Sequence, residues 1–158
     1  MMRESIPNRF PAELMDRTLA YLDRLGDMVL HLELHFAEPL DLARLVRAAA
    51  LTLVAEPILS CRLVPHWREP YWERITVSPD ALLTVAQTQC AYEIFKVAPL
   101  PVEAGPRLKL CVWTAPTGTY LLLKVCHYVA DAAGVKVVAG VLARIYNSLE
   151  QQPTYQPP

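Results

Sequence analysis

The sequence lacks any hydrophobic run long enough to cross a membrane. A bilayer-spanning helix needs about 18 or more consecutive apolar residues, and none of the 158 residues belongs to such a run. The N-terminal segment, Met1 to Pro11, carries charges and no apolar centre, so it does not have the pattern of a signal peptide. These absences predict a cytoplasmic protein with no membrane span.

An excess of charge of one sign is also missing. The chain has 15 Lys and Arg against 16 Asp and Glu, which gives a net charge of −1. Proteins that bind nucleic acid concentrate basic residues on one surface, so we expect no nucleic-acid partner. With 53% hydrophobic residues among 158, the chain is long enough to form one globular domain with its own core.

Closely spaced cysteines and other metal ligands are scarce. The four cysteines, at positions 61, 90, 111 and 126, form no C-x-x-C pair, which argues against a structural zinc site and predicts buried free thiols. His31 and His35 flank Glu33 in an alternating segment. Residues four apart on a strand are separated by roughly 13 Å, too far to share one ion, so we expect no metal.

Hydrophobic periodicity predicts a domain of mixed helices and strands. Apolar residues alternate from Met28 to Phe36, as in a strand, and recur at helical spacing from Leu42 to Val54 after the N-cap residue Asp41. The other predicted elements are a helix within 11–25, a hairpin of strands 58–64 and 71–77, a helix at 88–95, strands 107–114 and 120–126, and a helix at 135–149. This order predicts an α+β fold, with a mostly antiparallel, mixed sheet covered by helices on one face.

The segment from Leu121 to Gly134 is the best candidate for a functional site. A near-continuous apolar run, typical of a strand buried on both faces, ends at His127, and Asp131 follows four residues later. An imidazole titrates near neutral pH and can accept a proton from a hydroxyl or an amine. A satisfied structural histidine is the alternative. Asp131 could orient His127 or pair with a cation to anchor the turn, and the spacing leaves both open.

Residues around His127 resemble the active-site region of the chloramphenicol-acetyltransferase-like superfamily, which includes condensation domains and H-x-x-x-D acyltransferases. The segment Cys126-His127-Tyr128-Val129-Ala130-Asp131 is similar to the motif H-H-x-x-x-D-G of that group, with Cys126 in place of its first histidine. Neighbours on a strand face opposite ways, so Cys126 is expected in the core rather than as a nucleophile paired with His127. Three other segments, 39–45, 56–63 and 99–110, resemble further family motifs in the same order.

The resemblance implies specific roles for four residues. His127 matches the catalytic histidine, and Asp131 matches an aspartate that forms a structural salt bridge with an arginine, for which Arg62 is the candidate. Loss of either partner of such a buried pair would cost on the order of 3–5 kcal/mol. Ala132 stands where the motif has glycine, and Gly134 is expected to supply part of the lost backbone freedom.

The implied function is that of the N-terminal half of an acyltransferase. Such an enzyme moves an acyl group from a coenzyme A or carrier-protein thioester to a hydroxyl or amine acceptor, with no tightly bound cofactor. Family members continue into a second, similar half, so residues 1–150 are expected to be one half domain and the proline-rich residues 151–158 a tail or linker. A second half or self-association would complete the site. The alternative is a catalytically incomplete binding or scaffolding module of the same fold.

Overall fold

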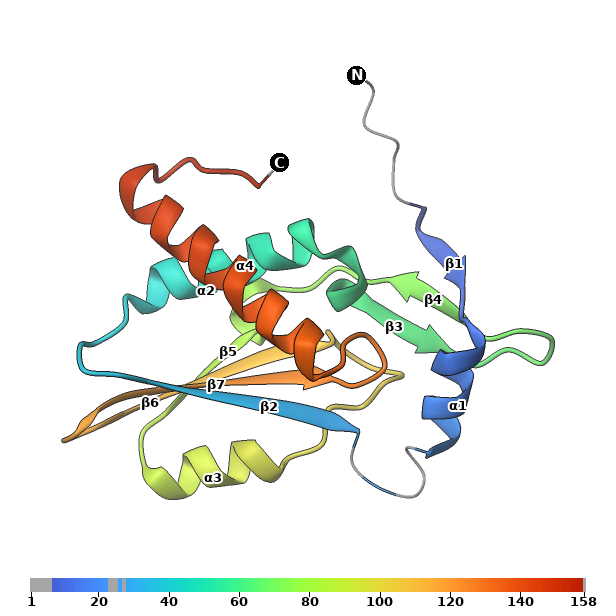
Figure 1. Ribbon diagram of the computed structural model, residues 1–158, viewed down its shortest axis with the longest axis horizontal. Helices are drawn as coiled ribbons and strands as arrows, with labels where there is room; N and C mark the ends of the chain where they lie inside the picture. The colour runs from blue at the N-terminus through green and yellow to red at the C-terminus, as the bar shows by residue number, and fades with distance from the viewer. Residues whose placement is uncertain (1–6, 23–25, 27, 158) are drawn as a thin grey trace.

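The computed structural model describes residues 7–22, 26 and 28–157, which form two sheets and four α-helices (Figure 1). The elements in chain order are β1 (Arg9–Pro11), α1 (Leu14–Leu22), β2 (Val29–Phe36), α2 (Leu42–Ala55), the short 3₁₀ helix η1 (Pro57–Ser60), β3 (Cys61–Val64), β4 (Tyr71–Arg74), the 3₁₀ helix η2 (Pro79–Ala81), β5 (Leu83–Ala86), α3 (Gln89–Val97), β6 (Leu108–Ala115), β7 (Gly118–Cys126) and α4 (Ala132–Gln151).

The larger sheet has four strands in the order β2-β7-β6-β5. Strand β7 pairs antiparallel with both β2 and β6, whereas β5 joins β6 in parallel and was not predicted from the sequence. All six residues from Leu121 to Cys126 are buried, which confirms the prediction of a strand covered on both faces. The strand therefore has neighbours on both edges and packing on both sides.

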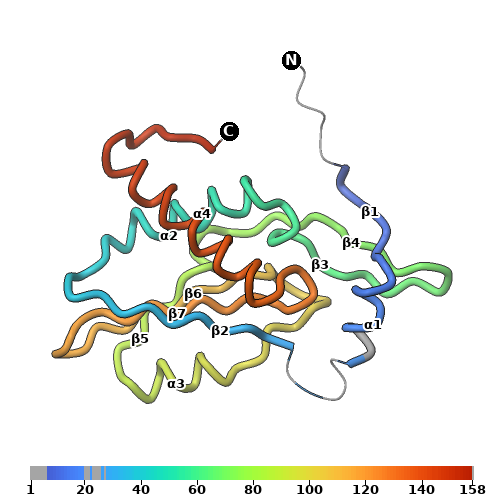
Figure 2. Tube along the Cα trace, in the orientation of Figure 1, coloured from blue at the N-terminus to red at the C-terminus, as the bar shows by residue number. Residues whose placement is uncertain are grey.

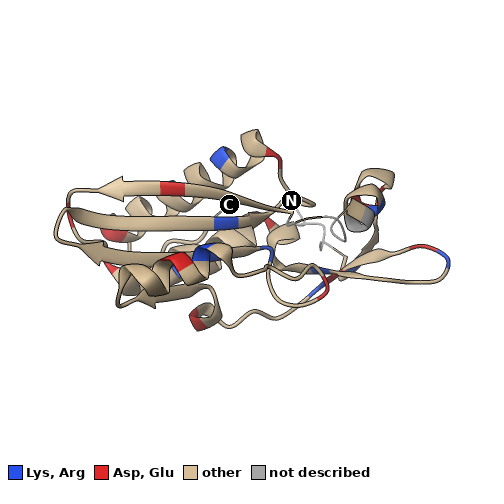
Figure 3. Cartoon of the chain, turned by 90° about the horizontal axis from the view of Figure 1, so that it is seen from below, with Lys and Arg blue, Asp and Glu red and all other residues tan. Residues whose placement is uncertain are grey.

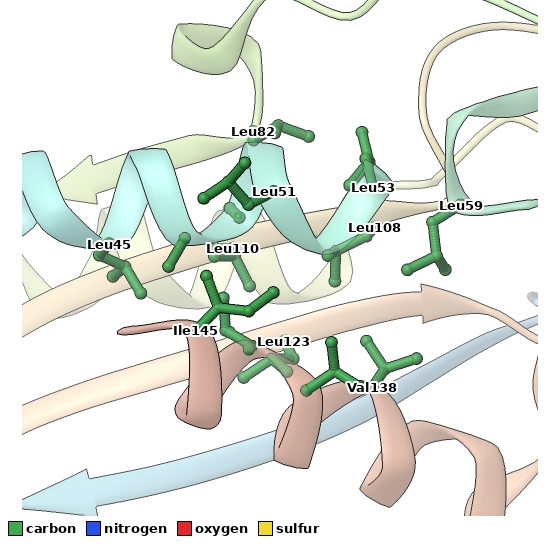
Figure 4. Close-up of a cluster of buried hydrophobic side chains, with 14 of the residues drawn as sticks. Leu45, Leu51, Leu53, Leu59, Leu82, Leu108, Leu110, Leu123, Val138 and Ile145 are labelled. Carbon is green, nitrogen blue, oxygen red and sulfur yellow. The ribbon is translucent and has the colours of Figure 1, made fainter. Parts of the chain in front are cut away.

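Helices α2 and α4 cover one face of this sheet and lie against each other (Figures 1 and 2). The predicted N-cap is confirmed, because the Asp41 side chain accepts a hydrogen bond from the backbone N–H of Arg44 at 3.0 Å. Leucines and valines from α2, α4 and the strands β6 and β7 form the main core between the layers (Figure 4). The apolar positions predicted for the last helix are all buried: Val135, Val138, Leu142, Ile145 and Leu149.

Helix α3 covers the opposite face, which corrects the expectation that helices lie on one side only (Figure 1). This second face carries Cys111 and Leu122, both fully buried, and Tyr92 of α3 packs against them. The Tyr92 hydroxyl donates to Glu33 of β2 at 2.8 Å, and this hydrogen bond lowers the pKa of Glu33. The predicted α+β class with a mixed sheet is confirmed, but its central strands need cover on both faces.

A buried lysine in the central strand holds α3 in place. Lys124 of β7 is 2% exposed, and its ammonium group donates to the carbonyl oxygens of Phe95 at 2.9 Å, Lys96 at 3.1 Å, and Ala98. These are the last carbonyls of α3, where the helix dipole favours a cation. The contact explains how a lysine side chain is accommodated in the buried part of this strand.

The smaller sheet has three strands in the order β1-β4-β3. The predicted hairpin is confirmed by the antiparallel pairing of β3 with β4, although residues 57–60 form a 3₁₀ turn instead of extending β3. Trp72 is buried beneath this sheet, and its indole N–H donates to Asp16 of α1 at 2.9 Å. The connecting loop of the hairpin extends away from the rest of the molecule (Figures 1 and 3).

The remaining predictions concern the ends of the chain and the thiols. The helix predicted within residues 11–25 is found as α1, while its predicted end at Leu25 lies outside the described residues, as do residues 1–6. After α4, Tyr155 packs against the main core. All four cysteines are free, and three are buried as predicted, but Cys90 is exposed on α3.

Within the described residues, no helix combines the length and the apolar character that a membrane crossing requires. Acidic and basic residues are interspersed over the side of the molecule seen in Figure 3. The structure thus shows no face dominated by one sign of charge in that view.

We predict that Lys124→Met lowers the free energy of unfolding by about 1–3 kcal/mol, because buried carbonyls at the end of α3 lose their donor. Urea unfolding followed by circular dichroism measures the change. Lys136→Met, at an exposed position of α4, is the matched control and should be close to neutral. Equal stability of both variants would contradict the proposed anchoring of α3.

Candidate active site

His127 lies immediately beyond the central strand β7. Its backbone N–H donates to the carbonyl of Met28 at 2.8 Å, and the preceding residue, Cys126, donates to the carbonyl of Arg107 at 3.0 Å. The chain is thus held on both sides at the point where the strand ends. A side chain at this position is carried by a rigid element, as a catalytic group requires.

The imidazole of His127 is half-buried. Its Nδ1 atom is buried and has no hydrogen-bond partner. Within the described residues, no carboxylate or second titratable side chain forms a hydrogen bond or ion pair with the ring. The site in this chain therefore consists of one imidazole on a fixed backbone, and any further polar group for the chemistry must come from substrate or from another polypeptide.

Cys126 is not part of this site. It is 1% exposed and belongs to a second hydrophobic cluster with Cys61, Leu63 and Trp72. The prediction that Cys126 is a core residue is confirmed.

Asp131 is the N-cap of α4. Its Oδ1 accepts a hydrogen bond from the backbone N–H of Gly134 at 2.7 Å, and the residue is exposed. No ion pair to Asp131 is present in the described part of the chain. The aspartate thus anchors the turn after His127 by satisfying a free helix N–H, not by neutralising an arginine.

The predicted pairing of Asp131 with Arg62 is wrong. Arg62 instead forms a salt bridge with Glu73 at 2.6 Å, and Glu73 also pairs with Arg9 at 2.6 Å. The strand geometry explains this, because Cys61 and Leu63 point into the core and side chains alternate along β3. Arg62 therefore points outward, directly across from Glu73 on β4.

Gly134 and Ala132 also differ from expectation. Ala132 begins α4, and no residue other than glycine has a positive φ in the described chain, so the missing motif glycine causes no backbone strain. Gly134 does not have a positive φ either. A Cβ atom at Gly134 would lie 3.0 Å from the Cβ of Ala130, so a close approach, and not backbone freedom, favours glycine there.

A buried arginine that the sequence analysis missed lies next to the site. Arg107 is 0% exposed, and its guanidinium donates to the carbonyls of Cys61 at 2.9 Å, Pro101 at 2.8 Å and Ala104 at 2.8 Å, and to that of Gly105. Burial lowers the pKa of Arg107, and the nearby Cys126 thiol acts in the opposite direction. The feature of the sequence that could have indicated burial is the position of Arg107, directly after Gly105-Pro106 and directly before an apolar strand.

Comparison with solved structures shows what this arrangement is similar to. The first condensation domain of the CDA synthetase superposes with a TM-score of 0.79 at 19% identity, covering 95% of this chain and 41% of that one. The starter condensation domain of rhizomide synthetase RzmA gives 0.77 at 13% identity, covering 96% and 40%. The SgcC5 protein from Streptomyces globisporus gives 0.74 at 19% identity, covering 94% and 39%.

The chain has the fold of one half of a condensation domain. Nearly the whole chain superposes, yet it spans only about two fifths of the length of these structures. No family model matches the sequence, and no curated protein matches it either. At these identities the likeness establishes the half-domain fold, which confirms the resemblance inferred from the motifs at the level of architecture.

We predict that Asp131→Ala destabilises the half domain by about 1 kcal/mol through loss of the α4 cap. Asp131→Asn should remain near wild-type stability, since asparagine also caps helices but carries no charge. Chemical denaturation of the three proteins separates the two roles. A loss of several kcal/mol in Asp131→Asn would show that the charge of this aspartate matters and would contradict its role as a cap.

Proposed function

We propose that this chain is the N-terminal half of an acyltransferase in which His127 is the general base. The donor is the thioester of coenzyme A or of a carrier-protein phosphopantetheine arm, and the acceptor is a small alcohol or amine. Support comes from a partly exposed imidazole at the end of the central strand, in a fold shared with condensation domains. The domain division expected from the sequence, 1–150 followed by a tail at 151–158, belongs to the same proposal.

In the proposed reaction, His127 accepts one proton and later returns it. The imidazole accepts the proton of the acceptor hydroxyl or amine while the oxygen or nitrogen attacks the thioester carbonyl carbon. Collapse of the tetrahedral intermediate breaks the carbon–sulfur bond, and the imidazolium of His127 returns the proton to the leaving thiolate, which regenerates the neutral base. A positioned general base contributes typically 10²–10⁴-fold to such a rate.

A second polypeptide would complete the site. The chain covers 41% of the condensation domain that it resembles, and no other described residue supplies a polar group to the imidazole. The missing half could be a continuation of the same chain, a separately encoded partner or a second copy. Acyl donor and acceptor would then bind between the two halves.

A binding or scaffolding module of the same fold is the second candidate. Two observations favour it: Asp131 has no arginine partner in the described chain, and Cys126 replaces the first histidine of the motif. Such a module would keep the fold and bind a partner without turning over a thioester. The two candidates make opposite predictions about turnover.

We predict that thiol release from acetyl-CoA or an acyl-pantetheine in the assembled protein falls at least 100-fold in His127→Ala, since the general base is lost. His66→Ala, on the exposed hairpin loop, is the matched control and should retain the full rate. Sedimentation velocity gives the size of the assembly at the concentrations used.

The assembled protein for this assay is a self-associated form, or a mixture with the polypeptide encoded after Pro158 if the reading frame continues. A monomer with no thioester turnover in either arrangement would favour the scaffolding module. Equal activity of His127→Ala and the wild-type protein would reject the role of His127 directly.

A further inference from the structure

We infer that Arg107 is a positioning residue for His127. This inference rests on the proposed function in one respect, that His127 is the reacting group. It concerns how the half domain fixes that group in space.

The guanidinium of Arg107 joins two segments that are distant in sequence. Its Nε donates to the carbonyl of Cys61 at the start of β3, and its Nη2 donates to three carbonyls of residues 101–105. Nη1 is buried with no hydrogen-bond partner among the described residues, and Cys126, Cys61 and Tyr128 are the side chains that act electrostatically on the guanidinium. The group is fully buried, and no carboxylate in the described part of the chain forms an ion pair with it, so these carbonyls stabilise its charge.

The backbone of Arg107 connects this cluster to the catalytic strand. Its N–H donates to the carbonyl of Leu59 at 2.7 Å, and its carbonyl accepts from Cys126 at 3.0 Å. His127 is the next residue, and its own N–H is held by Met28. Arg107 therefore lies where the start of β3, the 101–105 loop and the end of β7 meet. It is hydrogen-bonded to the residue that immediately precedes His127.

A lysine could not make the same set of contacts. The planar guanidinium presents donors in several fixed directions, whereas an ammonium group is a compact point charge with three donors. Arg62 does not compete for this role, since its side chain is 46% exposed and pairs with Glu73 on the outer surface. The two arginines thus provide a matched pair of positions for a test.

The experiment follows the ring signal of His127 in proton–carbon correlation spectra of the purified chain. The variants are Arg107→Lys, which keeps the charge, Arg107→Met, which removes it, and Arg62→Met as the control; His127→Gln assigns the signal. We expect the His127 signal to move or split in Arg107→Lys, while that of His66 stays in place. Arg62→Met should leave both signals unchanged.

A folded Arg107→Lys variant with a wild-type His127 signal would overturn the inference. If the Arg107 variants do not fold, amide hydrogen exchange in the wild-type chain decides: Cys126 and His127 should exchange as slowly as Leu123, and exchange at loop rates would overturn it. In the assembled enzyme, Arg107→Lys should lower kcat roughly 10- to 100-fold with little change in KM. A shifted His127 signal without thioester turnover in the wild-type protein would support the positioning role and reject the acyltransferase function.

Discussion

The burial of strand β7 on both faces is the constraint on which the rest of the structure depends. Helices α2 and α4 cover one side, and α3 covers the other, so the strand has neighbours in every direction until it ends. His127 is the first residue beyond that end, and Asp131 starts α4 only four residues later. The position of the imidazole is therefore a consequence of core packing and of a helix cap, and no metal or disulfide is needed to hold it.

Two buried basic side chains, Lys124 and Arg107, connect this core to neighbouring backbone segments. Lys124, near the end of β7, donates to the last carbonyls of α3, while Arg107 donates to carbonyls at the start of β3 and in the 101–105 loop. Backbone carbonyls accept hydrogen bonds from both groups, so each contact depends on the path of the chain around it.

Much of the fold could be predicted because its signals are local. The alternation in β2, the helical spacing in α4 and the Asp41 cap each lie within a short window of sequence. Strand β5 escaped prediction because it is four residues long and pairs in parallel with a strand more than 20 positions away. The cover of the second face by α3 depends on tertiary contacts, above all on Lys124, which no periodicity reveals.

The candidate site was predictable in part. The position of His127 at the end of a buried strand followed from the hydrophobic pattern, and the motif resemblance led to the fold that solved condensation domains share. The partner of Asp131 did not follow, because alternation along β3 and its register with β4 turn Arg62 toward Glu73. Which two side chains form a salt bridge depends on the face of the strand from which each side chain points. A family motif does not specify that face when the residues around it differ.

The proposed function requires that the imidazole of His127 meets the acyl thioester once a second polypeptide completes the site. The most direct test is a titration of the assembled protein with a thioether analogue of acyl-pantetheine, the part that both donors share, while the ring signals of the histidines are recorded. The account predicts that the His127 signal shifts in a saturable manner and that those of His66 and His35 do not. Saturable binding that leaves the His127 signal unchanged would contradict it.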